Sequence, residues 1–543
     1  MQAEIGSSQR LRPRSSTDER SAAASSFEEG ESVQSRLATM WREILKVDQV
    51  SLSDSFFELG GRSVNVMQLK ARVRDRLQTE ISISDVFRNP TLESLAELIE
   101  QSGTKTIHAP LSSLSEERYS DEQVLSFGEG LIWALSRSNP AYRAFNMQMG
   151  SYLEGDLKAD ALQQSIDALV CRHEVLRTTY AERDGAGVRV VTDALHVPVE
   201  VVDLRDVEEG KRQQRLIDHA TQSANKPFEL AAGPLMRVFL YRIAESRYVL
   251  NLIVHHIIAD AWSFAVLGRE LATFYESIQS GVPLSLQPPE LRYSEFARWQ
   301  RARASTQEFQ KSFEYWTRSL GALNSIARLP PDIKESLVGD AGKSSLTFHI
   351  EEALATRLRE LSISQGSTTF TGLLSVFMST LSAVANKPDV AVVVPIAGRS
   401  LTATEQVVGL FSNSIVIGAT CDQSLSRRAF QRQLDHICQQ AYTHQEVPFS
   451  IVRSKLENAG DLVKVIFDYL DGPEYNLPLP EMNAKPFSAK AANPFDTDLI
   501  VFINDHGSGY RFSVLFDSNR FSSNLVSDFF NTFHSGLKEL VEG

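Results

Sequence analysis

A short apolar stretch that ends in two histidines is the feature that most limits how this chain can fold. Residues 248–254 are apolar except at Asn251, which is typical of a buried strand. His255 and His256 follow directly, and because successive side chains of a strand point to opposite faces, only one of them can face a substrate. Asp260 stands four positions after His256. The stretch therefore predicts a buried strand that carries an imidazole to a reaction centre.

We interpret His256 as the working residue of this centre, with His255 and Asp260 as its support. A neutral imidazole is well matched to proton transfer near neutral pH, and a nearby aspartate can hold the local turn. Taken alone, the pattern fits a purely structural role equally well. Adjacent strand histidines diverge and no Cys/His cluster supplies further ligands, so we expect no metal.

A second informative stretch lies upstream, at Asp54-Ser-Phe-Phe-Glu-Leu-Gly-Gly-Arg-Ser63. The two glycines permit a tight loop, and Ser63 then stands where a helix should begin. The apolar residues that follow recur at helical spacing, at Val66, Leu69, Val73 and Leu77. A hydroxyl at this positive end of a helix suits a phosphodiester, although a helix cap is the commonest reason for a serine there.

The larger part of the chain alternates helices and strands rather than grouping them. The apolar spacing predicts a hairpin at residues 235–256, helices at 262–278 and 368–383, and a strand at 390–395. The sequence shows no internal repeat.

The histidine segment at 248–260 and the serine segment at 54–63 resemble motifs of a known protein family. Residues 31–102 resemble a peptidyl carrier domain of a nonribosomal peptide synthetase, and residues from about 121 to the end resemble a condensation domain of the same machinery. Five further stretches are similar to condensation-domain motifs in the expected order: Ser126-Phe-Gly-Glu-Gly-Leu-Ile-Trp133, Arg172-His-Glu-Val-Leu-Arg-Thr178, Tyr293-Ser-Glu-Phe-Ala-Arg-Trp299, Val408-Gly-Leu-Phe-Ser-Asn413 and His444-Gln-Glu-Val-Pro-Phe449.

The sequence and the resemblance together predict the domain organisation. Residues 1–30 are rich in Ser, Ala, Arg and Glu and are expected to form a flexible tail. Residues 31–102 are expected to form a small four-helix carrier bundle, and residues 103–120 a linker. The resemblance implies that the rest is a condensation domain of two αβ lobes, like chloramphenicol acetyltransferase, arranged in a V. We expect these lobes at residues 121–285 and 286–543.

The resemblance also implies the chemistry and the partners. A phosphopantetheinyl transferase would attach 4′-phosphopantetheine to Ser63, and an upstream adenylation domain would supply the aminoacyl or peptidyl group held there as a thioester. The condensation domain would transfer that group to an acceptor amine supplied in trans. The acceptor would be either an aminoacyl group on another carrier protein or a small-molecule nucleophile. His256 would remove the amine's proton or position the amine, and the sequence leaves both roles open.

Several residues are expected to support or border the site. Asp260 is expected to pair with a buried arginine, for which Arg399 is the candidate. Ser263 is expected to give structural support to the active site, together with Arg399. Ala261 replaces a glycine that usually borders the acceptor channel, so its methyl group is expected to narrow the channel or restrict the loop. The sequence also departs from the family's pattern at Arg62 and Leu131.

Two alternative functions remain open at this stage. One is chain release, in which the acceptor is a free amine or alcohol and the product is an amide or an ester. The other is a non-catalytic domain that keeps the fold to recruit a partner, for which a degraded histidine motif is the expected sign. The motif here is intact.

Composition agrees with these interpretations. A chain of 543 residues with 42% hydrophobic content can bury several cores. Its net charge of −13 argues against a nucleic-acid partner. Three scattered cysteines fit a reducing cytoplasm, and no apolar run approaches the roughly 20 residues that span a bilayer. We therefore expect a cytoplasmic protein that does not enter a membrane.

Overall fold

The chain forms two compact units, residues 1–81 with 88–107 and residues 82–87 with 108–543. The computed structural model describes residues 31–61, 63–102, 123–138, 145–283, 286–333, 343–457, 459–470, 477–489 and 497–543. The tail expected at 1–30 and the linker expected at 103–120 lie outside the described residues, as does Arg62.

The carrier region is helical, as predicted, with α1 (Val33–Leu45), α2 (Ser63–Leu77), α3 (Ile83–Arg88) and α4 (Leu92–Ser102). The predicted apolar stripe of α2 is buried throughout. Trp41 of α1 packs edge-on against Phe56, with ring centroids 5.0 Å apart. Arg76 of α2 pairs with Glu43 of α1 at 2.9 Å, so the two helices are joined by charge as well as by apolar packing.

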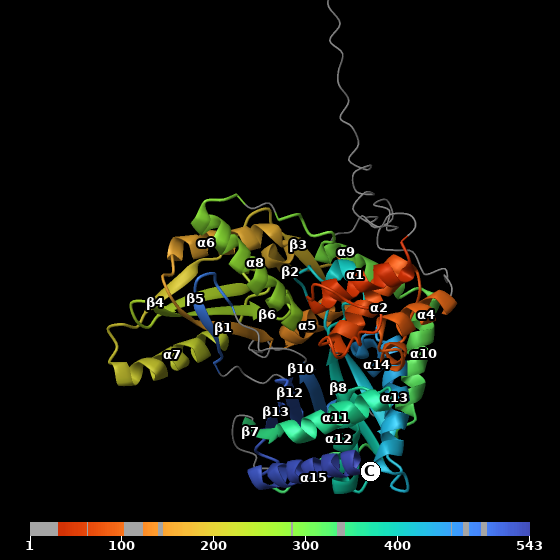
Figure 1. Ribbon diagram of the computed structural model, residues 1–543. Helices are drawn as coiled ribbons and strands as arrows, with labels where there is room; N and C mark the ends of the chain where they lie inside the picture. The colour runs from red at the N-terminus through yellow and green to blue at the C-terminus, as the bar shows by residue number, and fades with distance from the viewer. Residues whose placement is uncertain are drawn as a thin grey trace, which may run out of the picture. The chain divides into compact units, whose positions relative to one another are not determined.

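The second unit contains two lobes, each built on one large sheet (Figure 1). The first lobe has a five-stranded sheet in the order β11-β1-β6-β5-β4, from β1 (Asn146–Glu154), β4 (Val199–Asp203), β5 (Met236–Arg242), β6 (Arg247–His255) and β11 (Asn483–Phe487). A two-stranded sheet joins β2 (Thr178–Arg183) to β3 (Ala186–Val191). The helices of this part are α5 (Phe127–Ser138), α6 (Ala159–Arg172), α7 (Glu209–Ala224), α8 (Ala261–Ser280) and α9 (Tyr293–Arg303).

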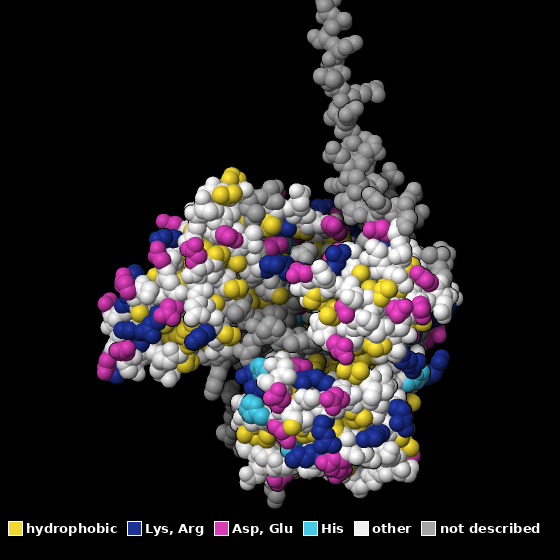
Figure 2. Space-filling view, viewed as in Figure 1, with side chains coloured by type: hydrophobic (Ala, Val, Ile, Leu, Met, Phe, Trp, Pro, Cys, Tyr) yellow, Lys and Arg dark blue, Asp and Glu magenta, His cyan; other side chains and the backbone are white. Residues whose placement is uncertain are grey.

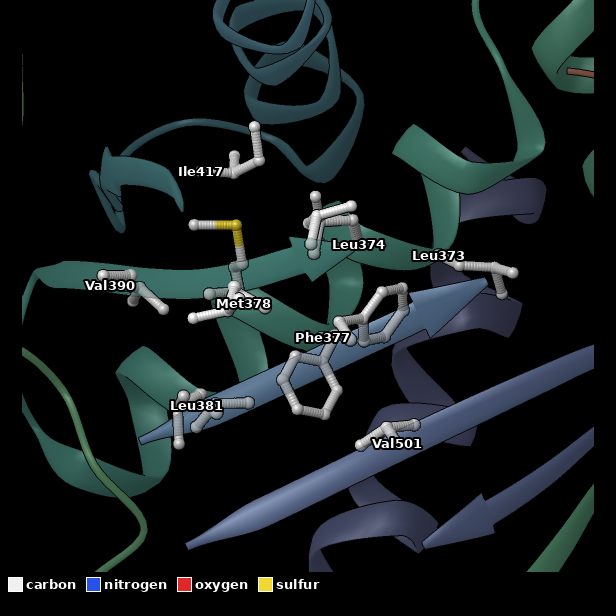
Figure 3. Close-up of a cluster of buried hydrophobic side chains, with 14 of the residues drawn as sticks. Leu373, Leu374, Phe377, Met378, Leu381, Val390, Ile417 and Val501 are labelled. Atoms are coloured by element: carbon white, nitrogen blue, oxygen red, sulfur yellow. The ribbon is translucent and has the colours of Figure 1, made fainter. Parts of the chain in front are cut away.

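The second lobe has a six-stranded sheet in the order β7-β13-β12-β10-β8-β9. Its strands are β7 (Lys343–Ile350), β8 (Asp389–Ile396), β9 (Asn413–Thr420), β10 (Val465–Leu470), β12 (Leu499–Asp505) and β13 (Tyr510–Asp517). Its helices are α10 (Gln307–Gly321), α11 (Glu352–Ser364), α12 (Thr369–Ala385), α13 (Arg427–Thr443), α14 (Phe449–Arg453) and α15 (Ser523–Glu542). Phe377, Met378 and Leu381 of α12 lie over β8 and β12 in its core (Figure 3).

The four elements predicted from spacing are all present. The hairpin is β5 and β6, which pair antiparallel, and the predicted helices and strand are α8, α12 and β8. A boundary at 285/286, however, does not separate the two sheets. β11 pairs with β1, and residues 407–411 join the core of the first lobe. The short strand β11 pairs with the edge of β1, whose backbone N–H and C=O groups would otherwise be unpaired on that side.

Two surface properties bear on partners. On the face shown in Figure 2, Lys and Arg side chains are interspersed with Asp and Glu over both lobes, so neither sign forms a continuous stripe there. Among the described residues, no single helix is long and apolar enough to cross a membrane. Helices α11 and α12 meet that test only as a pair bent by 107°.

Candidate active site

His256 lies immediately after the end of β6 and is half-buried. Its backbone N–H donates to the carbonyl of Phe145 at 2.7 Å, which fixes the residue beside β1. Its ring Nδ1 lies 2.7 Å from the carbonyl oxygen of Ala259. Because a carbonyl can only accept, Nδ1 must carry the proton, and Nε2 of the neutral ring keeps its lone pair. The site therefore presents one oriented imidazole nitrogen that can accept a proton.

His255 has a different environment, as strand alternation predicts. It is 3% exposed, and its ring packs edge-on against Phe145 and Phe228. Its Nδ1 accepts a hydrogen bond from the N–H of Ile257 at 3.3 Å. Burial first, and then His256 and Arg237, lower the pKa of His255 to about 3. His255 is thus a neutral packing residue at physiological pH.

This low pKa predicts an acid-sensitive first lobe. An unfolded His255 takes up a proton below its usual pKa of 6.5, whereas the folded one stays neutral to about pH 3, so stability falls as the pH drops through this window. We expect His255 to account for about 2 kcal/mol of lost stability at pH 5 relative to pH 7.5. Urea unfolding of wild type and His255→Asn at both pH values measures this. An equal pH dependence in the two proteins would contradict it.

Asp260 caps the N-terminus of α8, and both of its carboxylate oxygens are occupied. Oδ1 accepts from Ser263 N, Ser263 Oγ and Arg399 Nη2 at 2.8, 2.7 and 3.0 Å. Oδ2 accepts from Phe411 N and Ser412 N at 3.0 and 3.2 Å. The residue is 1% exposed. Since these bonds engage the carboxylate from all sides, Asp260 holds the site together and has no oxygen free for a substrate.

The ion pair predicted between Asp260 and Arg399 is present, with Nη2 3.0 Å from Oδ1. Arg399 Nη1 also donates to the carbonyls of Val407, at 2.7 Å, and Thr404. The guanidinium lies 4.1 Å from the centroid of the Phe411 ring. Burial lowers the pKa of Arg399, and Asp260 opposes that shift. Because Arg399 follows β8, this pair joins the second lobe to the histidine segment.

Ser263 also joins the two segments, and Ala261 lies beside it at the start of α8. Ser263 Oγ accepts from the N–H of Gly409 at 3.0 Å and lies 2.9 Å from the carbonyl of the same residue. Ala261 is the exposed first residue of α8, and its φ is not positive. A helical position tolerates alanine, so the backbone here does not require glycine. The expected effect of its methyl group on the acceptor channel or on the loop stays a prediction.

Sequence reasoning missed Tyr293, although this residue begins one of the motifs that resemble the family. The Tyr293 hydroxyl donates to the carbonyl of Leu410 at 2.6 Å and lies 3.0 Å from Ser126 Oγ. A Cβ atom at Gly409 would come within 2.0 Å of the Tyr293 ring, so only glycine fits there. Three of the motifs thus meet at residues 409–412, the loop that binds Asp260. The order of these motifs in the sequence indicated the family, but their contact with one another is seen only in the folded chain.

Ser63 is the first residue of α2, as predicted, and its side chain lies outside the described atoms. The loop before it is tight: Gly60 has φ 93°, and a Cβ at Gly61 would lie 2.5 Å from the carbonyl oxygen of Phe56. Backbone N–H groups at a helix N-terminus favour a nearby anion. This loop therefore fits the phosphodiester of a phosphopantetheine group.

The fold and the site define the class of protein. The condensation-domain family matches residues 119–543, and the phosphopantetheine attachment site matches residues 35–99. The chain therefore belongs to the condensation-domain family and carries a phosphopantetheine-bearing carrier domain in front of that domain.

Individual relatives support this assignment. The chain is 29% identical over 429 residues to tyrocidine synthase 3 of Brevibacillus parabrevis, covering 79% of this chain and 6% of that protein. It is 28% identical over 508 residues to phosphinothricin tripeptide synthetase PhsB of Streptomyces viridochromogenes, covering 91% of this chain and 42% of that protein. The chain thus spans less than half of either relative.

A solved structure confirms the two-lobed αβ fold. The X-domain from teicoplanin biosynthesis superposes with a TM-score of 0.70 at 18% identity, over 80% of this chain and 97% of that domain.

Proposed function

We propose that this chain forms an amide bond between an acyl group held at Ser63 and an acceptor amine, with His256 as the catalytic residue. The observation that carries this proposal is the oriented imidazole, whose Nδ1 donates to Ala259 O at 2.7 Å and whose Nε2 is left to accept. 4′-Phosphopantetheine on Ser63 supplies a thiol that holds the acyl group as a thioester. In this proposal residues 31–102 are the carrier domain and residues 121–543 the condensation domain.

His256 acts on the acceptor. As the amine nitrogen bonds to the acyl carbon it becomes positively charged, and it must lose a proton. The carbon–sulfur bond of the thioester breaks in the same transfer, and the departing sulfur would take up a proton to become the free thiol. Nε2 of His256 accepts the hydrogen bond of that N–H, which both positions the amine and gives the proton a destination. Holding both reactants in one site converts a bimolecular step into an effectively unimolecular one, which is the larger source of rate.

The partners follow from this reaction. A phosphopantetheinyl transferase modifies Ser63, an upstream adenylation domain supplies the acyl group, and the acceptor arrives on a second carrier protein. We expect these reactions in the cytoplasm. Chain release onto a free amine or alcohol would use the same His256 geometry. It differs from chain elongation only in the acceptor, which is a free molecule instead of a carrier-bound amine. The intact hydrogen bonding of His256 and Asp260 supports catalysis over recruitment alone.

Attachment at Ser63 is tested by intact-protein mass spectrometry after incubation with a phosphopantetheinyl transferase and acyl-coenzyme A. We expect one acyl-pantetheine group on wild type and none on Ser63→Ala. Ser102→Ala, which changes an exposed serine at the end of α4, is the matched control and should be modified fully. Modification of Ser63→Ala would show that the attachment residue lies elsewhere.

The acceptor is tested on the same loaded protein. An aminoacyl carrier protein and a set of free amines and alcohols are offered separately, and the acyl mass on Ser63 is followed. Transfer to the carrier supports chain elongation. Transfer only to a free nucleophile would replace it with chain release, and stable loading with every acceptor would contradict the proposed activity.

A further inference from the structure

The hydroxyl of Tyr180 contacts the turn that carries His256. Tyr180 lies on β2 and is 1% exposed, and its hydroxyl donates to Glu129 Oε1 at 2.7 Å. The carbonyl oxygen of Ile257, the residue after His256, lies 3.2 Å from the same hydroxyl. The single hydroxyl proton is therefore shared between a carboxylate oxygen and the backbone of the histidine turn.

The carbonyl of Ile257 depends on this contact. Within the described part of the chain, the Tyr180 hydroxyl is the only donor to that carbonyl. Ile257 is fully buried, and a buried carbonyl without a donor is costly. Inside the turn, the N–H of Ala259 reaches the carbonyl oxygen of His256 only at 3.4 Å. The hydroxyl is therefore the main restraint on the peptide group that follows Ile257.

This turn sets the direction of the His256 ring. The ring Nδ1 donates to the carbonyl oxygen of Ala259 at 2.7 Å, and that carbonyl follows the carbonyl of Ile257 by two peptide groups. A rotation of the Ile257 peptide group would move the Ala259 oxygen away from Nδ1. The neutral ring would then also carry its proton on Nε2, and an Nε2 in that state accepts no proton from an amine.

A buried charge pair holds Tyr180 in place. Arg189 Nε lies 3.4 Å from Glu129 Oε1, and both side chains are fully buried. Glu129 Oε2 accepts from the N–H of Ser126 at 2.7 Å, so the carboxylate is held on its other side as well. Burial first, and then the charge of Glu129, raise the pKa of Tyr180 well above its usual range. The hydroxyl thus keeps the proton that it donates.

The same contacts reach the other support of the histidine turn, Asp260. Ser126 Oγ lies 3.0 Å from the hydroxyl of Tyr293, which donates to a carbonyl of the loop at 409–412. That loop donates two backbone N–H groups to Asp260. Polar contacts therefore connect the Tyr180 hydroxyl at one side of the turn with the carboxylate at its end.

We propose that Tyr180 is a positioning residue whose hydroxyl, held by Glu129, fixes the turn so that Nδ1 of His256 carries the ring proton and Nε2 stays free to accept. This inference rests on the proposed condensation activity, in which Nε2 takes the proton of the acceptor amine. Tyr180 acts through the backbone of Ile257 and exchanges no proton with the substrate. Its loss should therefore lower the rate of transfer and leave the binding of the acceptor unchanged.

The first test reads the proton on the His256 ring in Tyr180→Phe, which removes only the hydroxyl. Nitrogen NMR of the full chain with labelled histidine is recorded at a pH where the ring is neutral, and the signal missing from His256→Ala assigns the ring. We expect wild type to carry the proton on Nδ1, and Tyr180→Phe to show a mixture of Nδ1–H and Nε2–H forms. A purely structural hydroxyl would leave the Nδ1–H form unchanged.

The second test is single-turnover transfer from loaded Ser63 at several concentrations of an aminoacyl carrier protein. We expect Tyr180→Phe to lower the limiting rate roughly 10- to 100-fold, because a small misplacement of a catalytic group is costly. The carrier concentration that gives half of this rate should stay within a few-fold of wild type.

Tyr275→Phe is the matched control. Tyr275 is a fully buried tyrosine of the same lobe, and its hydroxyl accepts from the backbone N–H of Lys158 at 2.9 Å. This variant should keep the wild-type ring proton and the wild-type rate, and equal losses in both variants would overturn the inference.

Three further results are decisive. A folded Tyr180→Phe that keeps the wild-type ring proton or the wild-type rate would overturn the inference. A Tyr180→Phe that does not fold would make the hydroxyl structural and overturn it as well. Wild type that transfers to no carrier would overturn the proposed function, whereas the NMR measurement would still decide whether Tyr180 positions the ring.

Discussion

An Asp260→Ala variant is expected to lose about 3–5 kcal/mol of stability in its second unit. The substitution leaves the Arg399 guanidinium, whose side chain is 1% exposed, without its counter-ion. It also removes the acceptor for the backbone N–H groups of Phe411 and Ser412 and for the cap of α8. A buried charge without a partner is far more costly than the loss of a surface pair.

Urea unfolding measures this loss, and two further variants show its origin. Asp203→Ala breaks an ion pair with Arg205 at 2.7 Å, but both groups are exposed, so little change is expected. Asp260→Ala combined with Arg399→Met removes both charges and should recover part of the loss. If Asp260→Ala were no less stable than Asp203→Ala, the buried pair would not hold the lobes at this point.

The sequence was sufficient to predict the histidine segment because its signals are local. A buried strand, two divergent histidines and the helix after them are all predicted by residues 248–278, and the structure contains β6, His255, His256 and α8 as expected. The partner of Asp260 was found through a motif resemblance rather than through spacing. A separation of 139 residues between Asp260 and Arg399 has no physical signature in the sequence.

Other features could not be predicted for physical reasons. β11 is a short strand with a polar pattern, and it pairs with β1 only because the chain returns to the first lobe. Tyr293 and Gly409 meet in the fold, and nothing in either segment alone indicates that close approach.

A His256→Ala variant is expected to transfer the acyl group about 10²- to 10⁴-fold more slowly than wild type, which is the usual contribution of general acid–base catalysis. Its fold should be nearly unchanged, because the ring is half-buried and its hydrogen bond to Ala259 O is worth only about 1 kcal/mol. His436→Ala, which removes an exposed histidine of α13, is the control and should keep the wild-type rate.

Single-turnover transfer from Ser63 is the measurement that tests the central claim most directly. Protein loaded with one acyl group is mixed with an aminoacyl carrier protein, and the acyl mass remaining on the chain is followed by intact-protein mass spectrometry. The account predicts rapid loss of that mass in wild type and in His436→Ala, with a product mass on the acceptor, and slow loss in a folded His256→Ala. Transfer by His256→Ala at the wild-type rate would contradict the account.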